Sequence, residues 1–235
     1  MAQYRRILLK LSGEALGGSA GFGIDPASIG RIADETAEVI RGGTQVGLVV
    51  GGGNFFRGAQ ASDPSLERAT VDSMGMLATV INSLAMADYL KARGAEAQVM
   101  SAVGMAPLAQ RLNRAKAIAA LDAGGAVVFA AGTGNPYFST DTAASLRAAE
   151  IEADLVAKAT KVDGVYDKDP NKHADAVRYE KISYAATLEK GLGVMDAAAV
   201  ALCRDNKLPV LVFNLNEPGS IGQAVRGEPI GTLMS

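Results

Sequence analysis

The 235-residue sequence contains one histidine, His173, and one cysteine, Cys203. So little histidine and cysteine argues against His-rich metal sites and against a Ser-His-Asp triad. A lone cysteine also excludes an internal disulfide and fits a reducing compartment, so we expect a cytoplasmic protein. No apolar run approaches the length of a signal-peptide core or a membrane span, so we expect neither processing nor membrane association.

The common nucleotide-binding motifs are also missing. No Gly-Lys dipeptide occurs, which excludes a Walker-type phosphate loop. Gly51-Gly52-Gly53 lacks the further glycine and the acidic residue of the dinucleotide fingerprint. The 23 basic and 25 acidic residues give a net charge of −2 and form no basic stripe with interleaved aromatic residues, so we expect no nucleic-acid partner.

Strand and helix patterns alternate along the chain. Apolar segments at 6–11, 45–50, 97–100, 127–131, 154–159 and 209–213 are typical of strands, several of them buried on both faces. Helical spacing predicts helices from Pro26 to Gly42 and at 66–93, 107–121, 140–153, 184–190, 196–206 and 219–226. This order predicts an α/β fold, a three-layer α/β/α sandwich with a mainly parallel central sheet.

The chain shows no sign of division into separate units. It is 49% hydrophobic and has no Pro- or Ser-rich linker, so residues 1–235 are expected to form a single domain. The polar, turn-rich segment 161–178 is expected to be an active-site loop.

Three of the predicted strands end in turns suited to anions. Ser12-Gly13-Glu14 follows the first strand, Gly51 to Asn54 follows the second, and the segment from Gly132 to Asp141 follows residues 127–131. Main-chain N–H groups converge in such turns, and a helix N-terminus adds a positive end. Because right-handed crossovers bring the carboxyl ends of parallel strands to one edge, these turns predict one cleft that holds a polyphosphate.

Five charged residues near these turns have both a functional and a plain structural interpretation. Lys10 ends an apolar strand, where its ammonium either faces an anion or reaches water along a buried stem. Arg57 either grips a phosphate or is a surface charge. Asp72, Asp141 and Asp196 are each accounted for by a solvated helix face or a helix N-terminus. The residues alone leave these alternatives open.

Four segments together resemble the bacterial uridylate kinases of the amino-acid kinase superfamily. They are residues 10–16 (KLSGEAL), 51–58 (GGGNFFRG), 132–141 and 158–166, and the resemblance covers essentially the whole chain. The first two are shared more widely in the superfamily, whereas 133–140 and the insertion at 18–23 are more specific. The resemblance implies an amino-acid kinase-like fold and the reaction ATP + UMP giving ADP + UDP, in pyrimidine nucleotide biosynthesis, with ATP and Mg²⁺ as cofactors.

The resemblance also implies roles for individual residues. The implied ATP contacts are Lys10, Leu11, Ser12, Gly13, Gly53, Arg57, Thr160, Tyr166 and Asp169. The implied UMP contacts are Gly52, Asp72, Thr133, Gly134, Asn135, Pro136, Tyr137, Phe138, Ser139 and Thr140. The implied catalytic residues are Lys10, Asp141 and Asp196, with Mg²⁺ held mainly through nucleotide phosphates.

Regulation and assembly are implied by the resemblance alone. It suggests a homohexamer that GTP activates and UTP inhibits, and the segment Gly18, Ser19, Ala20, Gly21, Phe22 and Gly23 is the candidate GTP-responsive region. Two other functions remain open: a kinase for a different superfamily acceptor, such as acetylglutamate, carbamate or isopentenyl phosphate, and a nucleotide-binding regulator or storage subunit without turnover.

Overall fold

The central sheet organises the molecule. The computed structural model describes residues 2–56, 65–170 and 172–235, and within these residues nine strands form one sheet in the order β4-β3-β5-β2-β1-β6-β10-β11-β9. All neighbouring pairs are parallel except β10 and β11, which confirms the expected mainly parallel sheet. The strands are β1 (Arg6–Leu11), β2 (Gln45–Val50), β3 (Ala97–Ser101), β4 (Gln110–Arg111), β5 (Ala126–Ala130), β6 (Leu155–Thr160), β9 (Lys181–Ile182), β10 (Val210–Asn214) and β11 (Thr232–Met234).

Helices cover both faces of this sheet. One buried cluster joins the strands to α1 (Pro26–Arg41), α2 (Arg68–Lys91) and α7 (Ser220–Arg226). A second cluster joins the opposite face to α3 (Arg114–Asp122), α4 (Thr140–Glu150), α5 (Tyr184–Glu189) and α6 (Ala197–Asp205). The predicted three-layer α/β/α sandwich is therefore confirmed.

Strand periodicity decides which side chains enter each layer. Successive side chains of a strand point to opposite faces. In β1, Ile7 and Leu9 pack with α1 and α2, whereas Leu8 packs in the cluster that contains α4. Lys10 has the parity of Leu8, so β1 directs it toward the α4 side.

Local sequence signals set several helix starts. Asp25 caps α1 by accepting a hydrogen bond from Ser28 N at 2.8 Å, with Pro26 in the first turn, as the sequence predicts. The predicted helix at 107–121 is wrong over its first half. There β4 pairs with β3, and Asn113 caps α3 through Lys116 N, so the helix begins at Arg114.

Two short strands lie where the sequence predicts a loop at 161–178. They are β7 (Val165–Tyr166) and β8 (Arg178–Tyr179), which pair antiparallel. Val165 N donates to Thr232 Oγ1 at 2.9 Å and so fastens this hairpin to β11. The strands β9 and β11 have no counterpart in the sequence prediction, because two- and three-residue strands carry too little periodicity to be recognised.

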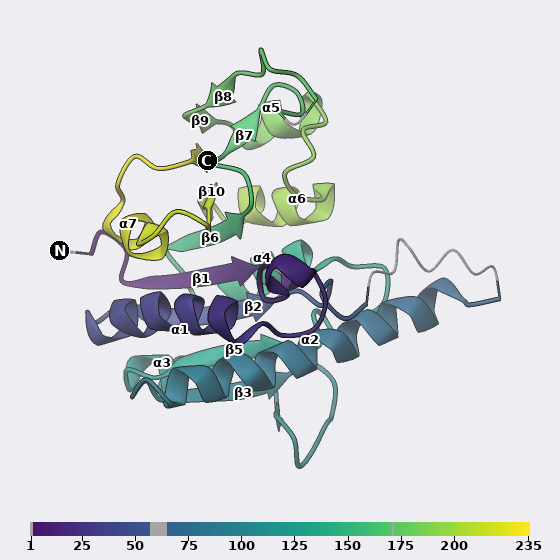
Figure 1. Ribbon diagram of the computed structural model, residues 1–235, viewed down its shortest axis with the longest axis vertical. Helices are drawn as coiled ribbons and strands as arrows, with labels where there is room; N and C mark the ends of the chain where they lie inside the picture. Colours follow the sequence, from purple (N-terminus) through teal and green to yellow (C-terminus); the bar gives the residue numbers. More distant parts are fainter. Residues whose placement is uncertain (1, 57–64, 171) are drawn as a thin grey trace.

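The carboxyl edge of the sheet brings the predicted anion-binding turns together. Strands β5, β2, β1 and β6 are consecutive neighbours, so the turns that follow β5, β2 and β1 lie side by side. Figure 1 shows this middle of the sheet, with the β7–β8 hairpin and α5 at the upper end and β3 and α3 at the lower end. No helix in the described residues is both long and apolar enough to cross a membrane.

Candidate active site

Two glycine-rich turns pack directly against each other at this edge. Gly51 N donates to Leu11 O at 2.9 Å, and a Cβ on Gly13 would lie 2.5 Å from Gly51 O. A Cβ on Gly52 would lie 2.7 Å from Ala78 of α2. Since no side chain fits at Gly13 or Gly52, close packing of the turns against each other and against α2 explains both glycines.

A carboxylate bridges two buried lysines beside these turns. Lys10 of β1 lies 2.8 Å from Asp141 Oδ1, and Lys158 of β6 lies 2.6 Å from Asp141 Oδ2. Lys10 and Lys158 are directly opposite each other in the parallel register of β1 and β6. Their exposed fractions are only 9% and 7%, so the Lys10–Asp141–Lys158 triad is a buried ionic cluster.

The pKa values in the triad reflect burial and the neighbouring charges. Burial opposes ionisation of Asp141, but the nearby positive charges of Lys10 and Lys158 outweigh it and lower the pKa of the carboxyl. Burial lowers the pKa of the Lys158 ammonium, and the charge of Lys10 acts in the same direction, whereas Asp141 and Asp196 oppose the change. The carboxylate of Asp141 is therefore ionised at neutral pH.

Asp196 holds the loop that precedes α4. Ser139 caps α4 by accepting hydrogen bonds from the N–H groups of Asp141 and Thr142. The hydroxyl of Ser139 in turn donates to Asp196 Oδ2, and the hydroxyl of Thr142 donates to Asp196 Oδ1 at 2.8 Å. Asp196 also caps α6 through Ala199 N. One carboxylate thus ties the start of α4 to the start of α6.

A cavity of about 140 Å³ lies between α2 and the loop after β5. Seven of the ten implied UMP contacts line it: Gly52, Asp72, Thr133, Asn135, Phe138, Ser139 and Thr140. Asp72 reaches the loop directly, because Tyr137 N donates to its Oδ2 at 2.8 Å. The structure therefore brings together a helix residue and a loop that are 65 positions apart in the sequence.

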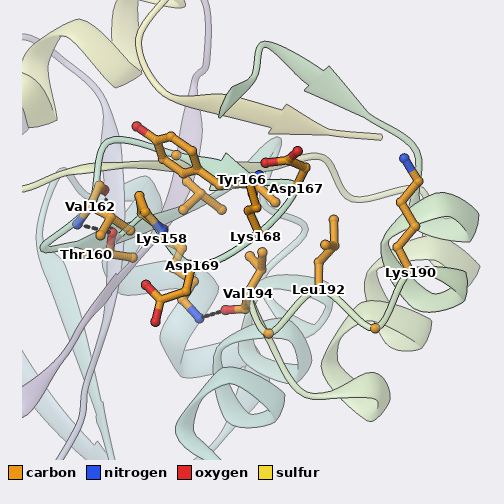
Figure 2. Close-up of a pocket in the computed structure, with 16 residues that line it drawn as sticks. Lys158, Thr160, Val162, Tyr166, Asp167, Lys168, Asp169, Lys190, Leu192 and Val194 are labelled. Atoms are coloured by element: carbon orange, nitrogen blue, oxygen red, sulfur yellow. Dashed lines mark hydrogen bonds between the residues drawn. The ribbon is translucent and has the colours of Figure 1, made fainter. Parts of the chain in front are cut away.

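A larger cavity of about 640 Å³ lies between β6, the β7–β8 hairpin and the segment after α5. It is lined by Lys158 and by three of the implied ATP contacts, Thr160, Tyr166 and Asp169. Figure 2 shows these side chains facing Leu192 and Val194 across the cavity, and the hydrogen bond from Lys158 Nζ to Val194 O. Its volume lies within the roughly 300–1,000 Å³ typical of ligand sites.

The remaining predicted residues are placed less directly. Leu11 is buried in the core, so only its main chain faces the turns. Ser12 lines a third cavity of about 210 Å³ with Thr160, Gly18 and Ser19. Gly53 belongs to the turn after β2, and Arg57 lies outside the described residues. The implied UMP contacts Gly134, Pro136 and Tyr137 do not line the 140 Å³ cavity.

Lys158 is the site residue that sequence reasoning missed. Its signal is the same as that of Lys10, a lysine near the end of an otherwise apolar strand. Arg147 was also missed. It is buried in α4 and its Nη2 donates to Gly132 O at 3.2 Å, which fixes the start of the loop after β5.

The carboxylates fit a magnesium ion held mainly by phosphate oxygens. No group of three or more His, Cys, Asp or Glu residues suited to a metal occurs in the described part of the chain. Both oxygens of Asp141 face lysines, and both oxygens of Asp196 accept hydrogen bonds. The donor set is oxygen-only and its oxygens are already engaged by lysines or hydrogen bonds, so a bound Mg²⁺ would be held mainly by water and phosphate oxygens.

Comparison with known proteins identifies the class to which this fold and site belong. Residues 5–214 match the model of the amino acid kinase family, so the chain belongs to that family. It is 55% identical over 231 residues to the uridylate kinase of Xanthomonas axonopodis pv. citri, covering 98% of this chain and 96% of the relative. It is equally similar to the uridylate kinase of Aeromonas salmonicida, with 98% and 95% covered.

Two solved structures similar to this chain are also UMP kinases. The UMP kinase from Bacillus anthracis superposes with a TM-score of 0.96 at 37% identity, over 99% of this chain and 96% of that one. The UMP kinase from Ureaplasma parvum gives a TM-score of 0.93 at 35% identity, over 99% of both chains. The amino-acid kinase fold implied by the sequence is therefore confirmed.

Replacing Asp141 by Asn tests the ionic triad. The variant leaves two buried ammonium groups without their carboxylate, so we expect the free energy of unfolding to fall by about 3–5 kcal/mol at pH 7, measured by urea denaturation. Because the folded pKa of Asp141 is lowered, this contribution is complete above about pH 4 and is lost as pH falls through the folded pKa.

The matched control is Asp205→Asn, whose partner Arg204 is an exposed neighbour. This surface pair should contribute at most about 1 kcal/mol. Equal losses in the free energy of unfolding in the two variants would show that the triad contributes no more to stability than a surface ion pair.

Proposed function

We propose that the protein is a UMP kinase that transfers the γ-phosphoryl group of ATP to UMP, giving ADP and UDP in pyrimidine nucleotide biosynthesis. The observation that carries this proposal is the Lys10–Asp141–Lys158 triad between two cavities. Lys158 lines the 640 Å³ cavity, and Thr140, next to Asp141, lines the 140 Å³ cavity. The 55% identity to enzymes named uridylate kinase supports UMP as the acceptor.

The chemistry requires alignment and positive charge and does not require a general base. The attacking phosphate oxygen of UMP is already ionised at neutral pH, so the enzyme must bring two anions together and stabilise charge on the transferred group. Lys10 and the N–H groups of the turns that contain Gly13 and Gly53 would supply fixed positive charge. Mg²⁺, when bound, would neutralise charge on the donor phosphates.

The two cavities suggest how donor and acceptor are distributed. We assign the adenosine of ATP to the larger cavity, with Thr160, Tyr166 and Asp169, because it has the volume of a nucleoside site. We assign UMP to the smaller cavity and the loop from Thr133 to Thr140. The phosphates would then meet at the two glycine turns, beside Lys10.

A phosphate-transfer assay tests the activity itself. With ATP and Mg²⁺, the protein should convert UMP to UDP at a higher kcat/KM than CMP, dCMP, acetylglutamate, carbamate or isopentenyl phosphate, as measured by coupled ADP release. Nucleotide binding without turnover on any acceptor would instead favour a regulatory or storage role.

Asp72 is the side chain best placed to recognise the acceptor from α2. Its carboxylate pairs with Arg68 at 2.9 Å and accepts from Tyr137 N, and its side chain is 19% exposed at the wall of the smaller cavity. A carboxylate has about four acceptor positions, so capacity remains for the hydroxyls of a ribose. In the arrangement proposed above, Asp72 would contact the sugar of the acceptor, whereas the reacting phosphates would lie beside Lys10.

Asp72→Asn should therefore affect acceptor binding more than chemistry. A charge-assisted hydrogen bond contributes about 1.5–3 kcal/mol, so we expect the KM for UMP to rise about tenfold or more, with a smaller fall in kcat and a nearly unchanged KM for ATP. Asp88→Asn is the matched control, because Asp88 is exposed on the same helix and pairs with Lys91. An unchanged KM for UMP, or an equal effect on ATP, would remove Asp72 from the acceptor site.

We also propose that residues 1–235 form a single cytoplasmic domain that assembles into a homohexamer. The single domain is supported by the sheet, in which β1 lies between β2 and β6. These two strands are far from each other in sequence, so early and late parts of the chain share one sheet. Assembly is supported by Met74, Leu77 and Ile81, exposed apolar residues at helical spacing on α2. A monomeric mass in light scattering would contradict the hexamer.

We further propose that GTP activates the enzyme through residues 18–23 and that UTP inhibits it. The support is a pair of hydrogen bonds between this segment and the turn after β2: Gly23 N donates to Asn54 O, and Asn54 Nδ2 donates to Gly23 O. Phe22, which is 70% exposed, also contacts the ring of Phe55. A change in the conformation of residues 18–23 would therefore alter the turn after β2 directly.

Replacing Gly21, Phe22 and Gly23 by alanine should abolish activation by GTP while basal UMP phosphorylation and inhibition by UTP persist. Gly43→Ala is the control for backbone strain, because Gly43 has a positive φ like Gly21 and Gly23 but lies in the turn before β2. Initial rates with and without GTP decide the matter, and unaltered activation in the triple variant would confine the segment to a structural role.

A further inference from the structure

The charges of the buried triad do not balance. Lys10 and Lys158 contribute two positive charges, and Asp141 contributes one negative charge. Asp196 is the next acidic group near Lys158; its negative charge also acts on Lys158, more weakly than that of Asp141, while its oxygens accept hydrogen bonds from Ser139 and Thr142. The triad alone therefore carries a net charge of about +1 in a region where charge is weakly screened.

The two lysines are held differently. Lys158 Nζ donates to Asp141 Oδ2 at 2.6 Å and also to Val194 O, so two separate elements fix it. Asp141 is the partner of Lys10 Nζ among the described residues. Lys10 thus has donors to spare for an anion, whereas the donors of Lys158 are largely used.

A single lysine would serve a phosphate poorly here. If Asp141 faced Lys10 alone, the two charges would cancel, and an incoming phosphate would gain little from the pair. A second cation on the other carboxylate oxygen takes up the charge of Asp141. The parallel register of β1 and β6 places Lys158 directly opposite Lys10, so that Lys158 is the second cation.

We propose that Lys158 is a positioning residue whose charge compensates Asp141, so that Lys10 keeps its positive charge available to the transferred phosphoryl group. This inference rests on the proposed phosphoryl transfer. It concerns the effect of the charge of Lys158 on Asp141 and Lys10, beyond the hydrogen bonds that Lys158 makes. Because Lys158 also binds Val194 O at the wall of the larger cavity, the same residue connects the donor site to the catalytic lysine.

Three substitutions separate charge from shape and hydrogen bonding. Lys158→Met keeps the length of the side chain without charge, Lys158→Gln keeps a hydrogen-bond donor without charge, and Lys158→Arg keeps the charge. We expect kcat to fall about a hundredfold in both neutral variants, with the KM for UMP changed less than about twofold. Lys158→Arg should recover most of kcat, to within about tenfold of the unaltered enzyme.

The control is Lys91→Met, which removes an exposed lysine that pairs with Asp88 on α2 and should leave kcat unchanged. Urea denaturation and UMP binding by calorimetry report on folding separately from turnover. Near-normal kcat in Lys158→Gln, or a folded Lys158→Arg as inactive as Lys158→Met, would overturn the inference. The unaltered enzyme is assayed in parallel. If it phosphorylates UMP and the variants give either of these results, only the role of Lys158 is refuted. If the unaltered enzyme does not phosphorylate UMP, the proposed function itself is refuted.

Discussion

The ionic bridge from Asp141 to Lys10 and Lys158 is the constraint on which the rest of the site depends. It requires β1 and β6 to be neighbours in parallel register, and it requires α4 to begin where its first turn meets their carboxyl ends. Breaking it leaves a buried charge without a partner, which is far more costly than losing a surface pair. The order of the central strands is thus tied to the electrostatics of the candidate active site.

A second set of constraints surrounds the glycine turns. Asn54 and Asn82 exchange amide hydrogen bonds at 3.0 and 2.7 Å, and each also donates to a main-chain carbonyl, Gly23 O and Gly51 O respectively. Buried amides satisfied in this way specify one arrangement of their surroundings. The pair fixes α2, the turn after β2 and the segment near Gly23 relative to one another, so the main chain of this turn is held in one arrangement.

The sequence predicts those features that depend on local patterns. Apolar runs, glycine turns and caps such as Asp25 identify the sandwich and the edge at which the turns meet. Lys158 could not be predicted in this way, because its role depends on the register between β1 and β6. Only that register, which pairs Lys10 with Lys158, shows that two lysines 148 positions apart face one carboxylate. The helix predicted at 107–121 fails because pairing of β4 with β3 outweighs helical spacing in its first half. The roles of the implied ATP and UMP contacts stay predictions, although the cavities bring many of them together.

The loop after β5 shows why the contacts that shape a predicted site were hard to derive from sequence. Its backbone is held in unusual conformations, with positive φ at Ala131 and Tyr137, and such conformations persist only where the surroundings enforce them. Here the enforcing contacts come from two helices and one helix cap: Arg147 of α4 donates to Gly132 O, Asp72 of α2 accepts from Tyr137 N, and Asp196, the N-cap of α6, accepts from Ser139. A side chain that shapes this loop therefore also shapes the 140 Å³ cavity, so a change in the shape of that cavity can arise at a residue that does not line it, such as Arg147.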